Sequence, residues 1–323
     1  VPKTKTKVML NMANPSAAFR WWQLPADGVG LARMEFVINS AVRVHPMALA
    51  RFSDIKDDSE KQLIEDLTRG YSDKKEYFVD KLSIGLSRIA AVFYPAPVII
   101  RMSDFKTNEY AKLLGGAQFE PDEENPMIGL RGASRYYDQI YKDGFALECK
   151  AIQRLRDVLG FSNVRVMIPF CRSPEEADKV LQVMTENGLS AGGNDLEVYM
   201  MCEVPSNVIL AKEFAKRFAG FSIGSNDLTQ LTLGADRDNE DLANLFDEQN
   251  PAVLWMIKTA IERAHSAGIK TGFCGQAPSN DPAFARFLVD AGIDSISVTP
   301  DSFLSVKTQV AAAESGSTKR KGR

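Results

Sequence analysis

Short apolar segments rich in β-branched residues recur eight times along the chain, and helical patterns lie between them. The eight segments cover residues 8–11, 31–34, 98–102, 164–168, 197–202, 220–223, 270–274 and 295–298. Helical periodicity is clearest over residues 59–93, 144–159, 174–187, 207–218, 251–267 and 281–291. Ser173 before Pro174, and Asp281 before Pro282, are typical of helix starts.

Strands that alternate with helices form parallel β/α units. Eight such units favour an α/β fold of the TIM type, a closed (β/α)8 barrel, and an open doubly wound sheet is the alternative. The connection over residues 39–93 is longer than one crossover needs, so it predicts extra helices inserted after strand 2. Residues 311–323 are rich in Ala, Ser, Gly and Lys and predict a disordered tail behind a barrel that ends at residue 310.

The amino-acid composition argues against several classes of partner and site. The chain has 323 residues, with 39 Lys and Arg against 42 Asp and Glu, and this balance argues against a nucleic-acid or membrane partner. The 4 cysteines are scattered without a C-x-x-C pair, and no apolar run is long enough to span a bilayer, so we expect a cytoplasmic protein. Only 2 histidines are present, His45 and His265, which argues against a His-rich metal site.

Chemically versatile side chains follow the predicted strands, at the end where the active sites of parallel barrels form. These strand-end residues are Asn11, Arg33, Glu35, Arg101, Asp104, Glu203, Asn226, Asp227 and Cys274. Glu203 and Asp227 end successive strands, so we expect them side by side with no charge between them. Two such carboxylates need a cation, and Mg²⁺ fits because it uses one or two carboxylates and keeps positions for substrate oxygens. In the alternative, one of them caps a helix.

Anion-binding groups accompany this carboxylate pair. Backbone N–H groups of Gly224, Ser225 and Asn226 could face an anion, and Arg33, Arg101 and Arg131 carry donors suited to carboxylate or phosphate oxygens. The combination predicts a site for a small substrate with several negative charges.

Cys274 lies between glycines at a strand end, so we expect an exposed thiol over the same mouth, able to donate or accept a proton. Cys149, Cys171 and Cys202 are interpreted as structural.

Three segments resemble the pyruvate/phosphoenolpyruvate-binding barrel shared by phosphoenolpyruvate (PEP) synthases, pyruvate phosphate dikinases and enzyme I of the sugar phosphotransferase system. They are GVGLARMEF at 28–36, NPMIGLRG at 125–132 and IGSNDLTQ at 223–230. Four more segments are similar to the PEP synthases within this family: IRMSDFKTNEY at 100–110, EENP at 123–126, MCEVPSN at 201–207 and CGQAPS at 274–279.

This resemblance implies a role for each matching position. Arg33 and Arg101 would bind the phosphoryl and enolate end of the substrate, and Cys274 would be the proton donor at the methyl or methylene carbon. Glu203 and Asp227 would hold Mg²⁺. The remaining implied substrate-binding positions are Gly224, Ser225, Asn226, Arg131 and Arg237.

The resemblance also implies partners. Neither histidine lies in a phosphohistidine motif, so the phosphohistidine and the ATP-binding domain would belong to other parts of a full-length enzyme, with residues 1–7 as the remnant of an interdomain linker. It further implies a homodimer through the barrel, with residues 39–93 as the candidate interface.

Three hypotheses follow. The first is phosphoryl transfer between that phosphohistidine and pyruvate, giving PEP. The second is a Mg²⁺-dependent lyase or aldolase acting on a small oxoacid, and the third is a non-catalytic PEP-binding module.

Overall fold

The eight predicted strands form one closed parallel barrel in the computed structural model, which describes residues 1–321. The strands are β1 (Lys7–Met12), β2 (Val29–Arg33), β3 (Val98–Arg101), β4 (Val164–Ile168), β5 (Val198–Cys202), β6 (Gly220–Ile223), β7 (Lys270–Phe273) and β8 (Ser295–Val298). Pairing of β1 with β8, from Lys7 opposite Ser295 to Leu10 opposite Val298, closes the ring. The barrel prediction is therefore confirmed, and the open doubly wound sheet is excluded.

Alternation along the strands separates two cores. Inside the barrel lies a small cluster made of Leu31, Ile99, Met167, Tyr199, Met201 and Cys274. Residues one position along point outward, as Val98, Ile100 and Val166 do, and pack in the larger core beneath the helices. The strands are thus buried on both faces, which is why they read as continuous apolar runs.

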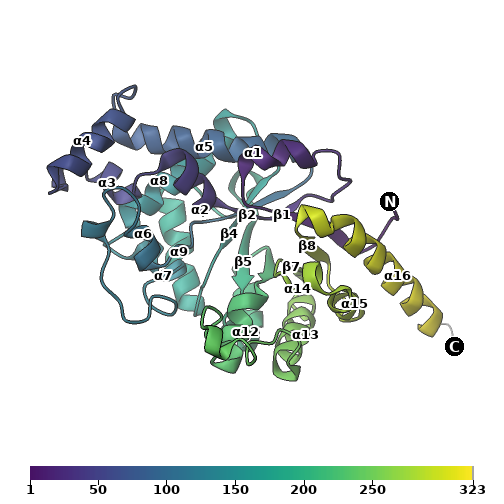
Figure 1. Cartoon of the computed structure of the whole chain (residues 1–323). Helices are drawn as coiled ribbons and strands as arrows, with labels where there is room; N and C mark the ends of the chain where they lie inside the picture. The colour runs from purple at the N-terminus through teal and green to yellow at the C-terminus, as the bar shows by residue number, and fades with distance from the viewer. Residues whose placement is uncertain (322–323) are drawn as a thin grey trace.

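Helices surround the barrel (Figure 1). Those outside the two longest connections are α1 (Pro15–Ala18), α9 (Pro174–Glu186), α10 (Pro205–Ile209), α11 (Ala211–Ala215), α12 (Ser225–Leu233), α13 (Pro251–Ser266), α14 (Ala277–Asn280), α15 (Pro282–Asp290) and α16 (Phe303–Lys321). The Ser173 hydroxyl accepts from the Glu176 N–H at 3.2 Å, and the Asp281 carboxylate accepts from the Ala283 N–H at 2.8 Å. Both predicted helix starts are therefore confirmed.

The connection after β2 carries the predicted extra helices α2 (Met34–Val37), α3 (Pro46–Ala50), α4 (Asp58–Leu67) and α5 (Lys74–Phe93). The single helix expected over 59–93 is two helices, because the Asp73 side chain accepts from the Lys75 N–H at 2.8 Å and starts α5 anew. A second long connection follows β3. It carries α6 (Thr107–Tyr110) and α7 (Ala133–Tyr137), which were not predicted, and α8 (Lys142–Gln153), which overlaps the helix predicted over residues 144–159.

The C-terminal segment differs from the expected disordered tail. Residues 311–321 continue α16, and the helix lies beside the N-terminal segment (Figure 1). Val306, Val310 and Ala313 are buried at helical spacing, and the Glu314 carboxylate accepts from the N–H groups of Lys5 and Thr6 at 2.9 and 2.7 Å. The alanines at 311–313 are strong helix formers, and Ala313 belongs to the buried face of this helix. Residues 322–323 lie outside the described part of the chain.

Within residues 1–321, no helix combines the length and the apolar character needed to cross a bilayer.

Candidate active site

A pocket of about 480 Å³ opens where the strands end at their carboxyl side. The ten residues to which the resemblance gives a role all line it: Arg33, Arg101, Arg131, Glu203, Gly224, Ser225, Asn226, Asp227, Arg237 and Cys274. Of the other expected strand-end residues, Glu35 and Asp104 line it too, whereas Asn11 does not and donates to Cys274 O at 3.1 Å. They come from the ends of β2, β3, β5, β6 and β7, from the long connection after β3 and, for Arg237, from the loop after α12. The structure therefore gathers at one mouth side chains that lie up to 241 residues apart, from Arg33 to Cys274.

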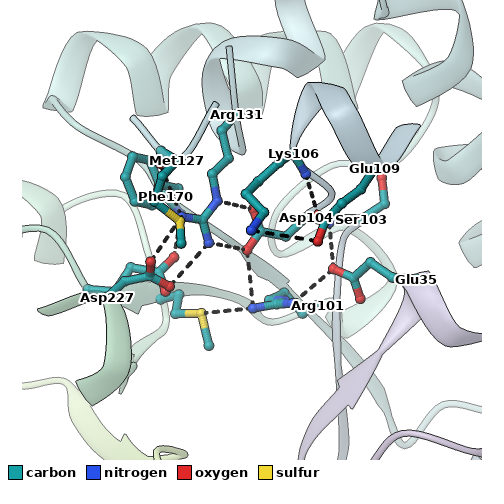
Figure 2. A network of polar contacts seen from close by, with 12 residues as sticks. Glu35, Arg101, Ser103, Asp104, Lys106, Glu109, Met127, Arg131, Phe170 and Asp227 are labelled. Atoms are coloured by element: carbon teal, nitrogen blue, oxygen red, sulfur yellow. Dashed lines mark hydrogen bonds and ion pairs between the residues drawn. The ribbon is translucent and has the colours of Figure 1, made fainter. Parts of the chain in front are cut away.

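Arg131 is the centre of the charged network in this pocket (Figure 2). Its guanidinium donates to both Asp104 oxygens at 3.0 Å and to the two Asp227 oxygens at 2.9 and 3.1 Å. It also lies over the Phe170 ring, 4.4 Å from the centroid, and is only 3% exposed. The sequence analysis did not foresee this cation at Asp227, because a loop distant in sequence brings Arg131 to it.

Arg101 is held at the end of β3 by two carboxylates. It donates to Glu35 Oε1 at 2.9 Å, and its other terminal nitrogen lies 3.3 Å from Asp104 Oδ2. Burial alone would lower the pKa of Arg101, but the carboxylates of Glu35, Asp104 and Glu203 outweigh it and raise the pKa. Arg101 is thus a permanent cation in a fixed orientation.

Arg33 contrasts with Arg101. Across residues 1–321 no carboxylate forms an ion pair with it, although it lines the same pocket. Burial and the positive charge of Arg101 lower its pKa. A partly buried guanidinium that repels its neighbouring cation is suited to an anionic ligand, which would supply the missing charge.

Glu203 is a buried carboxylate whose charge is poorly compensated. It is 1% exposed, and Oε1 accepts from the Phe170 N–H at 2.7 Å. Burial, followed by the negative charges of Asp227 and Asp104, raises its pKa. For Asp227, burial acts in the same direction, but Arg131 and Arg237 outweigh it and lower the pKa.

These two carboxylates fit a hard divalent cation. Glu203 Oε2 accepts no hydrogen bond from any residue within 1–321, and a Cβ at Gly224 would stand 2.9 Å from it, so glycine keeps this space open. The same residues hold no group of three or more His, Cys, Asp or Glu side chains able to enclose a metal. A cation held here would keep coordination positions for substrate oxygens, as Mg²⁺ does.

The start of α12 supplies backbone donors. Ser225 and Asn226 stand in its first turn, where N–H groups have no partner within the helix. The Gly224 N–H, in contrast, donates to Cys202 O at 3.1 Å. Gly224 therefore contributes space at this site, and the expectation that its own N–H faces an anion is wrong.

Cys274 lines the pocket but is 4% exposed, so the expectation of an exposed thiol is wrong. Its N–H and its sulfur both donate to Ile223 O, at 3.0 and 3.5 Å, and its carbonyl accepts from Asn11 Nδ2 at 3.1 Å. Burial raises the pKa of the thiol to about 11. The group is thus held as a neutral thiol at neutral pH.

Arg237 lies further out, at the rim, with one nitrogen 3.7 Å from Asp227 Oδ2. The lining also contains residues to which the sequence gave no specific role: Glu35 and Asp104, which were expected only as strand-end residues, and Lys106, Asp238 and Gln276. The position of Glu35 and Asp104 just after strands was the available signal, but their pairing with arginines depends on the fold.

Known proteins similar to this chain agree on its family. The family model for the PEP-binding domain of PEP-utilising enzymes matches residues 1–315. The phosphoenolpyruvate synthases of Synechocystis sp., Aquifex aeolicus and Escherichia coli are 58%, 52% and 48% identical to it, each over 97% of the chain. The chain spans only 38%, 42% and 39% of the length of these relatives.

Among solved structures, a malate synthase from Haloferax volcanii superposes with a TM-score of 0.51 at 13% identity, covering 97% of this chain and 76% of the other. A HpcH/HpaI aldolase/citrate lyase family protein from Burkholderia cenocepacia gives 0.50 at 15% identity, covering 96% and 94%. This likeness concerns the barrel fold alone. The sequence matches over nearly the whole chain show that it belongs to the PEP-utilising enzyme family and corresponds to its PEP-binding domain.

Proposed function

We propose that this barrel is the pyruvate and PEP site of a phosphoenolpyruvate synthase. The full reaction would convert ATP, pyruvate and water into AMP, PEP and phosphate, with a phosphohistidine on another domain carrying the phosphoryl group. The observation that carries the proposal is a neutral buried thiol, Cys274, in one pocket with two arginines and a carboxylate pair. Family membership favours this hypothesis over an oxoacid lyase and over a binding module.

The arginines would handle the charge of the phosphoryl group. Arg101, oriented by Glu35 and Asp104, and Arg33, which no carboxylate within 1–321 neutralises, would face the phosphoryl oxygens and stabilise the charge on them during transfer. The N–H groups of Ser225 and Asn226 would bind the substrate carboxylate.

Glu203 and Asp227 would hold Mg²⁺, which supplies Lewis-acid polarisation of the carboxylate and keto oxygens when bound. Arg131 would keep Asp227 ionised for this task, since it lowers the pKa of that carboxyl. Arg237 would cover the rim beside Asp227.

Cys274 would move the proton at the substrate carbon. A thiol with a pKa of about 11 is protonated at neutral pH, so it can donate to the methylene carbon when PEP is converted to pyruvate. In the direction of PEP synthesis, the thiolate form of Cys274 would accept a methyl proton and become the thiol, and the positive charges of Arg101 and Arg33 favour that thiolate by lowering its pKa.

Two further points belong to the proposal. Four free cysteines support a cytoplasmic setting. Exposed Leu63 on α4 and Ile84 on α5 support the inserted helices as a homodimer face.

Calorimetric titration tests the proposed substrate. We expect the chain to bind PEP in the presence of Mg²⁺, and Glu203→Gln to weaken this binding at least roughly ten-fold, since a cation ligand is lost. Glu176→Gln is the matched control, because Glu176 is also buried but does not line the pocket. PEP binding that ignores both Mg²⁺ and Glu203, or cleavage of oxaloacetate by the chain, would contradict the proposal.

A further inference from the structure

Ser103, the residue just before Asp104, has all of its polar groups bound inside the protein. Its N–H donates to Glu148 Oε2 at 3.1 Å, its hydroxyl donates to Glu148 Oε1 at 2.5 Å, and its carbonyl accepts from the Tyr136 hydroxyl at 2.8 Å. The Tyr110 hydroxyl lies 2.6 Å from Ser103 Oγ. A loop residue tied in this way has little freedom to move. We call Ser103, Glu148, Tyr110, Tyr136 and Tyr141 the Ser103 cluster.

Glu148 is an unusual group at the centre of this cluster. It is completely buried on α8, and no Lys or Arg among residues 1–321 forms an ion pair with it. Its oxygens instead accept from neutral donors, including the Tyr141 hydroxyl at 2.6 Å. Burial raises its pKa to about 7. A carboxylate kept in such surroundings costs stability, and this indicates a role other than stabilising the fold.

The cluster connects directly to the charged network of the pocket. The Asp104 N–H donates to Glu35 Oε1 at 2.5 Å, and the Asp104 carboxylate binds Arg131 and lies 3.3 Å from Arg101. Asp104 therefore sets the orientation of both guanidinium groups, and Ser103 sets the backbone of Asp104. Glu148 itself does not line the pocket. It can act on a ligand only through this chain of contacts.

A second buried layer holds the tyrosine rings. The Arg135 guanidinium lies over Tyr110 and Tyr141, 4.0 and 4.9 Å from the ring centroids. Arg135 is paired with Glu120, which is also 2.8 Å from His45 Nε2. Arg135 and His45 are both 0% exposed. The rings of Tyr110 and Tyr141 thus pack against Arg135, and the Tyr136 ring stacks on Phe145 with centroids 4.1 Å apart, which makes the cluster a rigid support.

We propose that Glu148 is a positioning residue for the phosphoryl-binding corner of the pocket, and this rests on the proposed function. By fixing Ser103, it holds the Asp104 carboxylate so that Arg101 keeps the orientation that the phosphoryl group of PEP requires. Pyruvate lacks the phosphoryl group, so its binding depends less on the Arg101 guanidinium. A positioning role therefore predicts a specific loss of PEP affinity.

Two variants and one control test this inference in the full chain. Glu148→Gln places an amide N–H against donors of Ser103 or Tyr141, and Tyr136→Phe removes the bond to the Ser103 carbonyl. Tyr77→Phe is the matched control, because its buried hydroxyl also donates to a backbone carbonyl, that of Val42, at 3.0 Å. Melting temperature and calorimetric affinities for PEP and pyruvate with Mg²⁺ are measured for each.

We expect Tyr136→Phe and Tyr77→Phe to lower the melting temperature by similar amounts. Glu148→Gln and Tyr136→Phe should weaken PEP binding roughly ten- to hundred-fold, as displaced binding groups do, and change pyruvate affinity much less. Tyr77→Phe should leave both affinities near the parent values.

Equal losses for PEP and pyruvate, or a loss of PEP affinity no larger than in Tyr77→Phe, would overturn the inference while the parent protein still binds PEP. Absence of PEP binding by the parent protein would overturn the proposed function, and the inference with it.

Discussion

Replacing Arg131 with methionine removes a side chain that joins Asp104 to Asp227. The parent side chain is 3% exposed and makes two hydrogen bonds to each carboxylate, with lengths between 2.9 and 3.1 Å. Methionine fills much of the same space over Phe170 but carries no charge. Asp104, 8% exposed, and Asp227, 5% exposed, would then face Glu203 without this cation.

The expected loss of stability is large. Breaking a buried ion pair by removing one partner costs about 3–5 kcal/mol, because the remaining charge stays buried. For a chain of this size, about 2 °C of melting temperature corresponds to each kcal/mol, so the melting temperature of Arg131→Met should fall by about 6–10 °C.

Thermal unfolding followed by circular dichroism measures this effect, with Arg217→Met as the control. Arg217 also binds a carboxylate with two nitrogens, at 2.6 and 2.7 Å, but its partner Asp178 is 55% exposed. Exposed pairs contribute about 1 kcal/mol or less, so the control should lose about 2 °C at most.

The loss should also depend on pH. Arg131 lowers the pKa of Asp227 below 3.8, so the stability that this pair contributes is present above that pH and is lost as the pH falls through the folded pKa. The two proteins should therefore become more alike in strong acid. A melting temperature of Arg131→Met within 2 °C of the parent at pH 7 would refute the account of this network.

Three further predictions concern single side chains. Burial raises the pKa of Glu148 from 4.5 to about 7, so the folded state binds this proton more tightly than the unfolded state, and the parent protein should lose about 3 kcal/mol of unfolding free energy between pH 4.5 and 7. Denaturant titration should find this loss missing in Glu148→Gln. An equal change of unfolding free energy with pH in the two proteins would contradict the prediction. Iodoacetamide should label Cys274 at pH 8 roughly a hundred-fold more slowly than an ordinary thiol, with a rate that rises toward pH 11, and rapid labelling at pH 7 measured by mass spectrometry would argue against a neutral thiol. Gly224→Ala should weaken Mg²⁺-dependent PEP binding, since its Cβ would stand 2.9 Å from Glu203 Oε2, whereas Gly70→Ala, which meets nothing within 4 Å, should bind as the parent does.

Local sequence patterns were sufficient to predict the barrel and its strands. The runs at residues 164–168 and 220–223 are short and contain β-branched or aromatic apolar residues, and their observed bounds as β4 and β6 are the predicted ones. Helix starts at Ser173 and Asp281 depend on side-chain capping within three residues, which the sequence also displays. The short helices α6 and α7, with four and five residues, have too few residues to show helical periodicity, and the sequence did not predict them, although the Glu109 carboxylate at α6 accepts from the Lys106 N–H at 2.7 Å.

For the candidate site, the positions of the residues could be predicted from the sequence, but their charge states could not. The topology of a parallel barrel brings strand-end residues to one mouth, so Arg33, Glu203 and Cys274 could be placed there without a structure. Their charge states could not, because each depends on residues distant in sequence. Arg131 reaches Asp227 across 96 positions, and the burial of Cys274 follows from packing against β6 and from the Asn11 side chain.

The central claim is that the pocket activates the methyl carbon of pyruvate through Cys274. The direct measurement is proton NMR of pyruvate in deuterated water with Mg²⁺ and the chain, which reports the loss of methyl protons. We predict exchange by the parent protein, and loss of that exchange in Cys274→Ala while pyruvate still binds. Exchange that persists in Cys274→Ala, or pyruvate that binds to the parent protein without exchange, would contradict the assignment of Cys274 as the proton carrier.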